Sequence, residues 1–155
     1  MSSIKAFVRG RFNVSDLADK LDPAKDMRLD RSNLNEEFTR QAGLAASYGY
    51  VYAEAEAEAS SLEFKLARVH AEVDKEVRIN LFKEGSKATE KIVENLVIMD
   101  ERYIETKEEL IEARKNKRVL KAACDALDHK LQALINAGAT DRKNHEVIIK
   151  DDGFV

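Results

Sequence analysis

The feature that most constrains the fold is the lack of helix breakers over a long central stretch. Between Ser32 and Ala137 the chain contains no proline and a single Gly-Ser dipeptide, Gly85-Ser86. Proline interrupts helices and glycine commonly ends them, so this stretch predicts a few long helices joined at one hinge. Long helices of this kind cannot bury their apolar faces alone. They need one another, or further copies of the chain.

Composition points to an extended helical protein. Of the 155 residues, 35% are charged and only 6% are aromatic, with no tryptophan, which is poor material for a compact globular core. The 26 basic and 29 acidic residues give a net charge of −3, which argues against a histone-like protein that coats duplex DNA. Cys124 is the only cysteine, so no intrachain disulfide can form.

The expected location is the cytoplasm, and the bacterial host cytoplasm if the protein is encoded by a phage. The N-terminal residues lack the long apolar core of a signal peptide. No stretch approaches the roughly 20 apolar residues that a membrane-spanning helix requires, so no membrane partner is expected.

The fold class predicted is all-α, a long antiparallel helical hairpin with a short connecting helix that assembles into a homo-oligomer. Residues 1–31 are predicted to form an N-terminal arm, residues 32–138 the hairpin, and residues 139–155 a C-terminal tail. The arm contains phenylalanines beside arginines, which either bind single-stranded nucleic acid or dock on the protein's own fold or on a neighbour. The hairpin helices are expected at about 33–82, 87–99 and 101–137.

Capping residues and apolar spacing set these bounds. Asn33, Ser86 and Asp100 are predicted to cap the three helices, and Gly138 is predicted to end the last one. Both long helices carry apolar side chains at alternating spacings of four and three residues, which is typical of helices that pack on each other. The first seam comprises Tyr48, Tyr52, Ala55, Ala59, Leu62, Leu66, Val69 and Val73, and the second comprises Leu110, Ala113, Lys117, Leu120, Cys124, Leu127, Leu131 and Leu134.

The short helix is expected to turn four side chains inward, and the last helix to carry assembly. The inward side chains of the short helix are Ile92, Val93, Leu96 and Val97. The expected contacts between copies in the homo-oligomer involve Leu120, Leu127, Leu131 and Leu134.

An enzymatic function is not expected, and the sequence suggests no catalytic residue, metal site or cofactor. Three histidines lie far apart, and no Cys-x-x-Cys, His-Glu-x-x-His or Gly-rich phosphate loop occurs.

Basic residues near the hinge form the candidate binding site. At about 100° per residue, Arg68, Lys75 and Arg78 fall on one exposed arc of the first helix, away from its seam. Lys83, Lys87 and Lys91 extend this positive stripe around the hinge, where the first amides of the short helix are expected to accept a phosphate. The stripe is therefore either a site for a polyanion or a solvated charged face, and these spacings alone favour neither.

A second basic cluster, residues 114–121, surrounds its helix instead of marking one face. Lys117 lies at a seam position, where a lysine commonly sets register or oligomeric state. This cluster is therefore expected to pair with acids of the first helix, such as Glu54, Glu56 and Glu58, in the same or a neighbouring copy, in preference to binding DNA.

The order of features resembles that of the phage recombination mediators of the UvsY type. The resemblance covers about residues 29–140. It rests on Leu29-Asp30-Arg31-Ser32 before an acidic helix start, a tyrosine-bearing helix, Val77-Arg78-Ile79 before a glycine hinge, Thr89-Glu90-Lys91 in the next helix, and an Ala/Leu-rich last helix.

The resemblance implies a homo-oligomer that binds single-stranded DNA, loosens the single-strand-binding protein and loads a RecA-like recombinase. In that family the basic segment before the hinge binds DNA, which here corresponds to Lys75 and Arg78 with Lys83 and Lys87 as neighbours. The main alternative is a non-enzymatic structural or adaptor coiled-coil protein, such as a phage scaffold or assembly factor. A third is an inhibitor that binds a nuclease or polymerase through its acidic helix.

Overall fold

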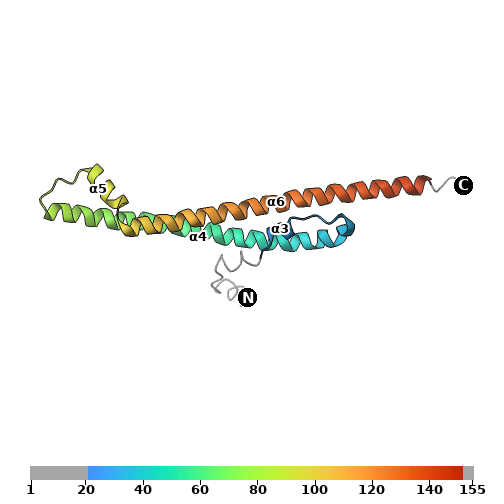
Figure 1. Cartoon of the computed structure of the whole chain (residues 1–155), viewed down its shortest axis with the longest axis horizontal. Coiled ribbons are helices and arrows are strands. Elements are labelled where there is room, and N and C mark those ends of the chain that lie inside the picture. The colour runs from blue at the N-terminus through green and yellow to red at the C-terminus, as the bar shows by residue number, and fades with distance from the viewer. Residues whose placement is uncertain (1–20, 152–155) are drawn as a thin grey trace, which may run out of the picture. The chain divides into compact units, whose positions relative to one another are not determined.

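The computed structural model describes residues 21–151, with side chains from residue 21 to residue 143. The described part is all-helical, as predicted, and contains no strand. Figure 1 shows the element order, which is α3 (Pro23–Asp26), the 3-10 turn η1 (Arg31–Asn33), α4 (Leu34–Lys83), α5 (Glu90–Ile98) and α6 (Glu101–Asp151). The arginines and phenylalanines of the predicted arm, between residues 7 and 12, lie outside the described residues.

The chain divides into two compact units, and α4 and α6 contribute to both. Of the described residues, unit 1 comprises 21–52 and 120–151, and unit 2 comprises 53–119. In unit 2 the ion pairs between the two long helices join Glu76 to Arg102, Lys65 to Glu109 and Glu56 to Lys117. The residue numbers fall on α4 as they rise on α6, so these segments pack antiparallel.

The predicted seams form the helix contact. Most of their side chains are buried, and the rest, including Lys117, are half-buried. The four leucines expected to carry assembly therefore lie inside the chain's own fold, where Leu120, Leu127 and Leu134 are buried and Leu131 is half-buried. A second copy would have to contact other side chains.

The hinge is built on a left-handed glycine. Gly85 has φ +68°, a conformation that costs glycine little and other residues more. The Gly85 N–H donates to the Phe82 carbonyl at 3.1 Å and the Ser86 N–H donates to the Leu81 carbonyl at 3.0 Å. This pair of bonds is the Schellman motif that closes a helix.

Because Ser86 belongs to that motif, it does not cap the next helix. The prediction of a helix from Lys87 capped by Ser86 is wrong, since α5 begins at Glu90 and Thr89 caps it. Val93 and Val97, four residues apart, are buried in a cluster with Val69 and Val73 of α4. The predicted inward positions of Ile92 and Leu96 are wrong, because a helix of nine residues turns only this one stripe toward α4 and leaves both exposed.

The predicted caps of the long helices are confirmed at their N-termini. Asn33 Oδ1 accepts the Glu36 N–H at 3.4 Å, and Asp100 Oδ1 accepts the Arg102 N–H at 3.0 Å. The predicted end of the last helix at Ala137 is wrong, because α6 continues to Asp151. Gly138 does not adopt the left-handed conformation that ends α4, and its α-carbon faces the ring of Phe38, which a Cβ would meet at 3.7 Å.

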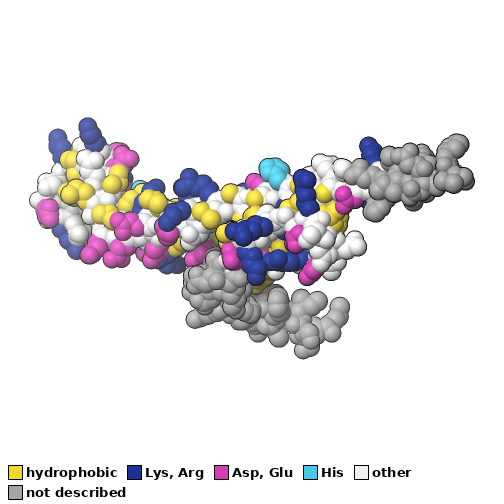
Figure 2. All heavy atoms as spheres, turned by 45° about the vertical axis from the view of Figure 1, so that its right-hand side comes forward, with side chains coloured by type: hydrophobic (Ala, Val, Ile, Leu, Met, Phe, Trp, Pro, Cys, Tyr) yellow, Lys and Arg dark blue, Asp and Glu magenta, His cyan; other side chains and the backbone are white. Residues whose placement is uncertain are grey.

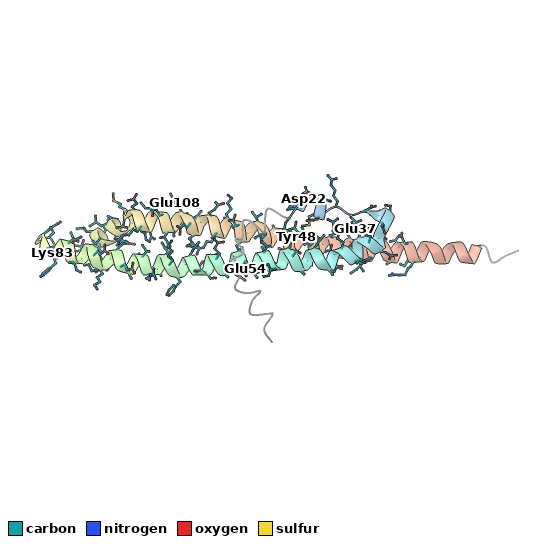
Figure 3. All side chains as sticks on the ribbon, turned by 90° about the horizontal axis from the view of Figure 1, so that it is seen from below. Asp22, Glu37, Tyr48, Glu54, Lys83 and Glu108 are labelled. Carbon is teal, nitrogen blue, oxygen red and sulfur yellow. The ribbon has the colours of Figure 1, made fainter. Side chains whose placement is uncertain are left out.

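A buried polar network attaches α3 to the hairpin of unit 1. Asp26 is buried and forms an ion pair with Arg40, and the Tyr48 hydroxyl donates to Asp26 Oδ2 at 3.1 Å. From α6, Lys130 Nζ donates to the Asp26 backbone carbonyl at 2.9 Å and also pairs with Glu37. Figure 3 labels Asp22, which caps α3, together with Tyr48 and Glu37 of α4. The described end of the predicted arm thus docks on its own fold.

This network predicts a loss of stability at alkaline pH. Burial, with the hydrogen bond to Asp26, raises the pKa of Tyr48 to about 12 from the usual 10.0. Between these values the folded state keeps a proton that the unfolded chain has released, so stability falls as pH rises through this window. We expect the midpoint of urea unfolding to fall less steeply with pH in Tyr48→Phe than in the wild type. Equal slopes would contradict the assignment.

Candidate nucleic-acid interface

The outward face of α4 in unit 2 carries the predicted stripe. On the side of α4 opposite the seam, one set of positions follows the same alternating spacing of four and three residues. All side chains of this set are exposed except that of Arg78, which is half-buried. We call this set the outer stripe. It consists of Ala57, Ser61, Phe64, Arg68, Ala71, Lys75, Arg78 and Phe82. It contains three basic residues and no acidic residue.

Two arginines of the outer stripe are held by acids at its margins. Arg68 lies 3.5 Å from Glu72. Arg78 bonds Asp74 at 2.7 Å and reaches across to Glu90 of α5, also at 2.7 Å. These hydrogen bonds raise the pKa of Arg78 and lower the pKa values of Asp74 and Glu90. Arg78 therefore fastens the start of α5 to α4, and its charge is largely offset.

The lysines of the predicted site are placed differently. Lys75, Lys83, Lys87 and Lys91 are exposed, and none has an ion-pair partner among the side chains of residues 21–143. Lys83 is the last residue of α4, at the hinge (Figure 3). In Figure 2, Lys and Arg side chains at this end of the molecule stand among hydrophobic and acidic ones. These four charges remain available to phosphates.

The start of α5 offers less to a phosphate than predicted. Thr89 Oγ1 accepts the Ile92 N–H at 3.4 Å, and Glu90 places a carboxylate in the first turn. Because that side chain repels an anion, the helix terminus is not part of the site we describe.

The second basic cluster is mostly neutralised within the chain. Lys117 pairs with Glu56 of α4 at 2.8 Å, which is one of the acids predicted for it, and Arg114 pairs with Glu63 at 2.7 Å. Lys115 and Lys121 pair with acids of α6 itself. The structure thus pairs most of this cluster with acids, whereas Lys75, Lys83, Lys87 and Lys91 form no ion pair among the described side chains.

Two residues that the sequence reasoning did not single out stand on the outer stripe. Phe64 is 74% exposed and Phe82 is 85% exposed, although both belong to a helix that buries its apolar seam. The spacing that defines the seam, continued on the opposite face, would have found them.

Comparisons with protein families, with curated proteins and with solved structures find no match to this chain. In the described part of the chain no helix is long and apolar enough to cross a membrane. Within the same residues no group of three or more histidine, cysteine, aspartate or glutamate side chains is placed to hold a metal ion.

Proposed function

We propose that the protein binds single-stranded DNA along unit 2 and acts as a recombination mediator, without catalysis. The observation that carries the proposal is the contrast in charge pairing. Most basic side chains between α4 and α6 have acidic partners, whereas Lys75, Lys83, Lys87 and Lys91 have none among the described side chains. A protein with net charge −3 does not attract a polyanion through its overall charge. Unpaired lysines therefore favour binding of a polyanion at the place where they lie.

Single-stranded DNA is the ligand that the family resemblance implies, since lysine contacts to phosphates do not by themselves distinguish single strands from duplex. Four lysines and no sequence-reading motif provide phosphate contacts with little base preference. Each protomer then binds weakly, and several protomers in a homo-oligomer bind a strand by multivalency. Affinity of this kind falls steeply with salt and permits transfer of the strand to a RecA-like recombinase in place of the single-strand-binding protein. The mediator role and these protein partners rest on the family resemblance.

The surface available for a homo-oligomer is apolar and lies outside the seams. On α6 of unit 2, Val119 is 61% exposed and Ile111 is also exposed. In unit 1, Ile135 is exposed. These side chains replace the buried leucines as the expected contacts between copies.

The DNA test removes unpaired lysines and keeps Arg78, because Arg78 holds α5. The variant Lys75→Gln/Lys83→Gln/Lys87→Gln should bind a dT oligonucleotide more weakly than the wild type. It should also reduce the slope of log affinity against log salt by about 2 per protomer, at about 0.7 per phosphate contact. Fluorescence anisotropy across a salt series measures both.

A control of equal charge separates a site from a general effect. Lys65, Lys115 and Lys121 are each in an ion pair on the surface, and their replacement by glutamine removes the same number of charges. We expect this control to bind almost as the wild type does. If both variants bind DNA with unchanged affinity and salt slope, Lys75, Lys83 and Lys87 belong to a solvated charged face. The structural or adaptor function then becomes the better proposal.

A further inference from the structure

The two phenylalanines of the outer stripe are exposed without a structural reason within the described residues. Phe64 and Phe82 lie on the side of α4 opposite the seam, so they add nothing to the packing of α4 on α6. Exposing a large aromatic ring costs free energy, which an exposed ring recovers when it meets a partner.

Their spacing places both rings in line along the helix. They are separated by 18 residues of the uninterrupted helix α4, which is five turns, so the rings project from the same side about 27 Å apart. Between them the outer stripe holds Arg68, Ala71, Lys75 and Arg78. The two arginines are paired with acids at the margins of the stripe, so Lys75 is the cation there without an ion-pair partner among the described side chains. The small side chain of Ala71 leaves room for a strand to lie close to the helix.

An alternation of aromatic rings and positive charges is the chemistry that recognises single-stranded nucleic acid. Phosphates meet the cations, and bases stack on the rings whatever their identity, because every base has a π-face. A second protein helix would fit the apolar rings but would have to bury Lys75, which has no acidic partner among the described side chains. The charge of the stripe therefore favours a polyanion that carries aromatic rings.

We propose that Phe64 and Phe82 are base-stacking residues that mark the two ends of a single-stranded DNA path along α4. The inference rests on the proposed function and adds to it the direction of the strand path, along the α4 axis. It also adds a class of contact, with bases, that lysines alone do not supply. Lys83, Lys87 and Lys91 follow Phe82 in the chain, so a strand that leaves the α4 part of the path at Phe82 continues to the hinge.

The experiment uses the absence of tryptophan from the chain. Phe64→Trp and Phe82→Trp each introduce a single tryptophan, whose emission is quenched when a base stacks on it. Each is titrated with a dT oligonucleotide and with an abasic strand of the same length, which has the phosphates but no bases. Ile104→Trp, on the exposed surface of α6, is the matched control.

We expect the dT strand to quench both α4 reporters, the abasic strand to quench neither, and the control to respond to neither strand. The double variant Phe64→Ala/Phe82→Ala should bind dT at least about tenfold more weakly and bind the abasic strand as the wild type does. This loss should leave the salt slope unchanged, because no phosphate contact is removed.

Four results would overturn the inference in different ways. If both strands bind with wild-type affinity but neither reporter at positions 64 and 82 is quenched, the lysine site stands and the stacking is removed. Quenching of the Ile104→Trp control alone moves the strand to α6. A double variant that binds dT normally but sediments as a smaller species assigns the rings to contact between copies. Absence of wild-type binding to either strand at low salt removes the proposed function as well.

Discussion

Replacing Lys130 by methionine should destabilise unit 1 by about 3–5 kcal/mol, far more than a surface lysine would. Lys130 is buried, pairs with Glu37 of α4 and donates to the Asp26 carbonyl of α3. Methionine fills a similar volume, so the loss comes from the charge. It leaves the Glu37 carboxylate without its cation and the docked α3 segment without one of its bonds.

Lys65→Met is the matched control, because Lys65 also joins α4 to α6 through an ion pair, with Glu109 at 2.6 Å. Both partners are about half exposed to water, so its loss should cost less than about 1 kcal/mol. Urea unfolding followed by circular dichroism gives both free energies. The double variant Lys130→Met/Glu37→Leu should recover most of the loss, since it also removes the Glu37 carboxylate that Lys130→Met leaves without its cation. A Lys130→Met variant as stable as the control would refute the buried pair.

The helical framework was predictable from the sequence because it depends on local chemistry and on spacing. Three features can be recognised from the order of residues alone. They are the long stretches without proline, the capping side chains Asn33 and Asp100, and the alternating four- and three-residue spacing of apolar side chains. The hinge at Gly85 was found for the same reason. These features determine which side of each helix is buried before any partner is known.

What was not predictable depended on contacts between distant residues. Gly138 resembles a helix terminator, yet its surroundings at Phe38 let α6 continue. Arg78 looked like a free cation on its arc, because the Glu90 that pairs with it comes from another helix. Lys130 carried no signal, since a lysine near a seam is ordinarily assigned to solvent. The partners named here lie at least 12 residues away in sequence, although Arg78 also pairs with Asp74, four residues away on its own helix.

The candidate site likewise contains residues that the sequence predicted and residues that only the structure identified. Lys75, Lys83, Lys87 and Lys91 were found because basic residues and their helical spacing are visible in the sequence, whereas their lack of acidic partners among the described side chains needed the structure. Phe64 and Phe82 were missed because an apolar residue in an amphipathic helix is first assigned to the core. Only their exposure identifies them as residues that the fold itself does not use.

The second large effect is expected at Leu127, where aspartate should unfold unit 1. This side chain is 1% exposed, and the Gln41 amide bonds the Leu127 carbonyl at 2.7 Å, so the position lies at the contact of α6 with α4. Truncation of a buried leucine alone costs about 2–5 kcal/mol, and a buried carboxylate adds to that cost. The sequence prediction that such leucines carry assembly would instead give a folded, smaller species.

Val119→Asp distinguishes unfolding of unit 1 from loss of assembly. Val119 precedes Leu127 on α6 by about two helical turns, but it is exposed. The Val119→Asp variant should melt like the wild type in circular dichroism, and if the exposed apolar surface joins copies, its sedimentation coefficient should fall. Leu127→Asp should lose helical signal at temperatures where Val119→Asp keeps it. If Leu127→Asp instead melts like the wild type and only sediments as a smaller species, the buried leucines would be assigned to the interface between copies. The hairpin of unit 1 would then have to form its seam without them.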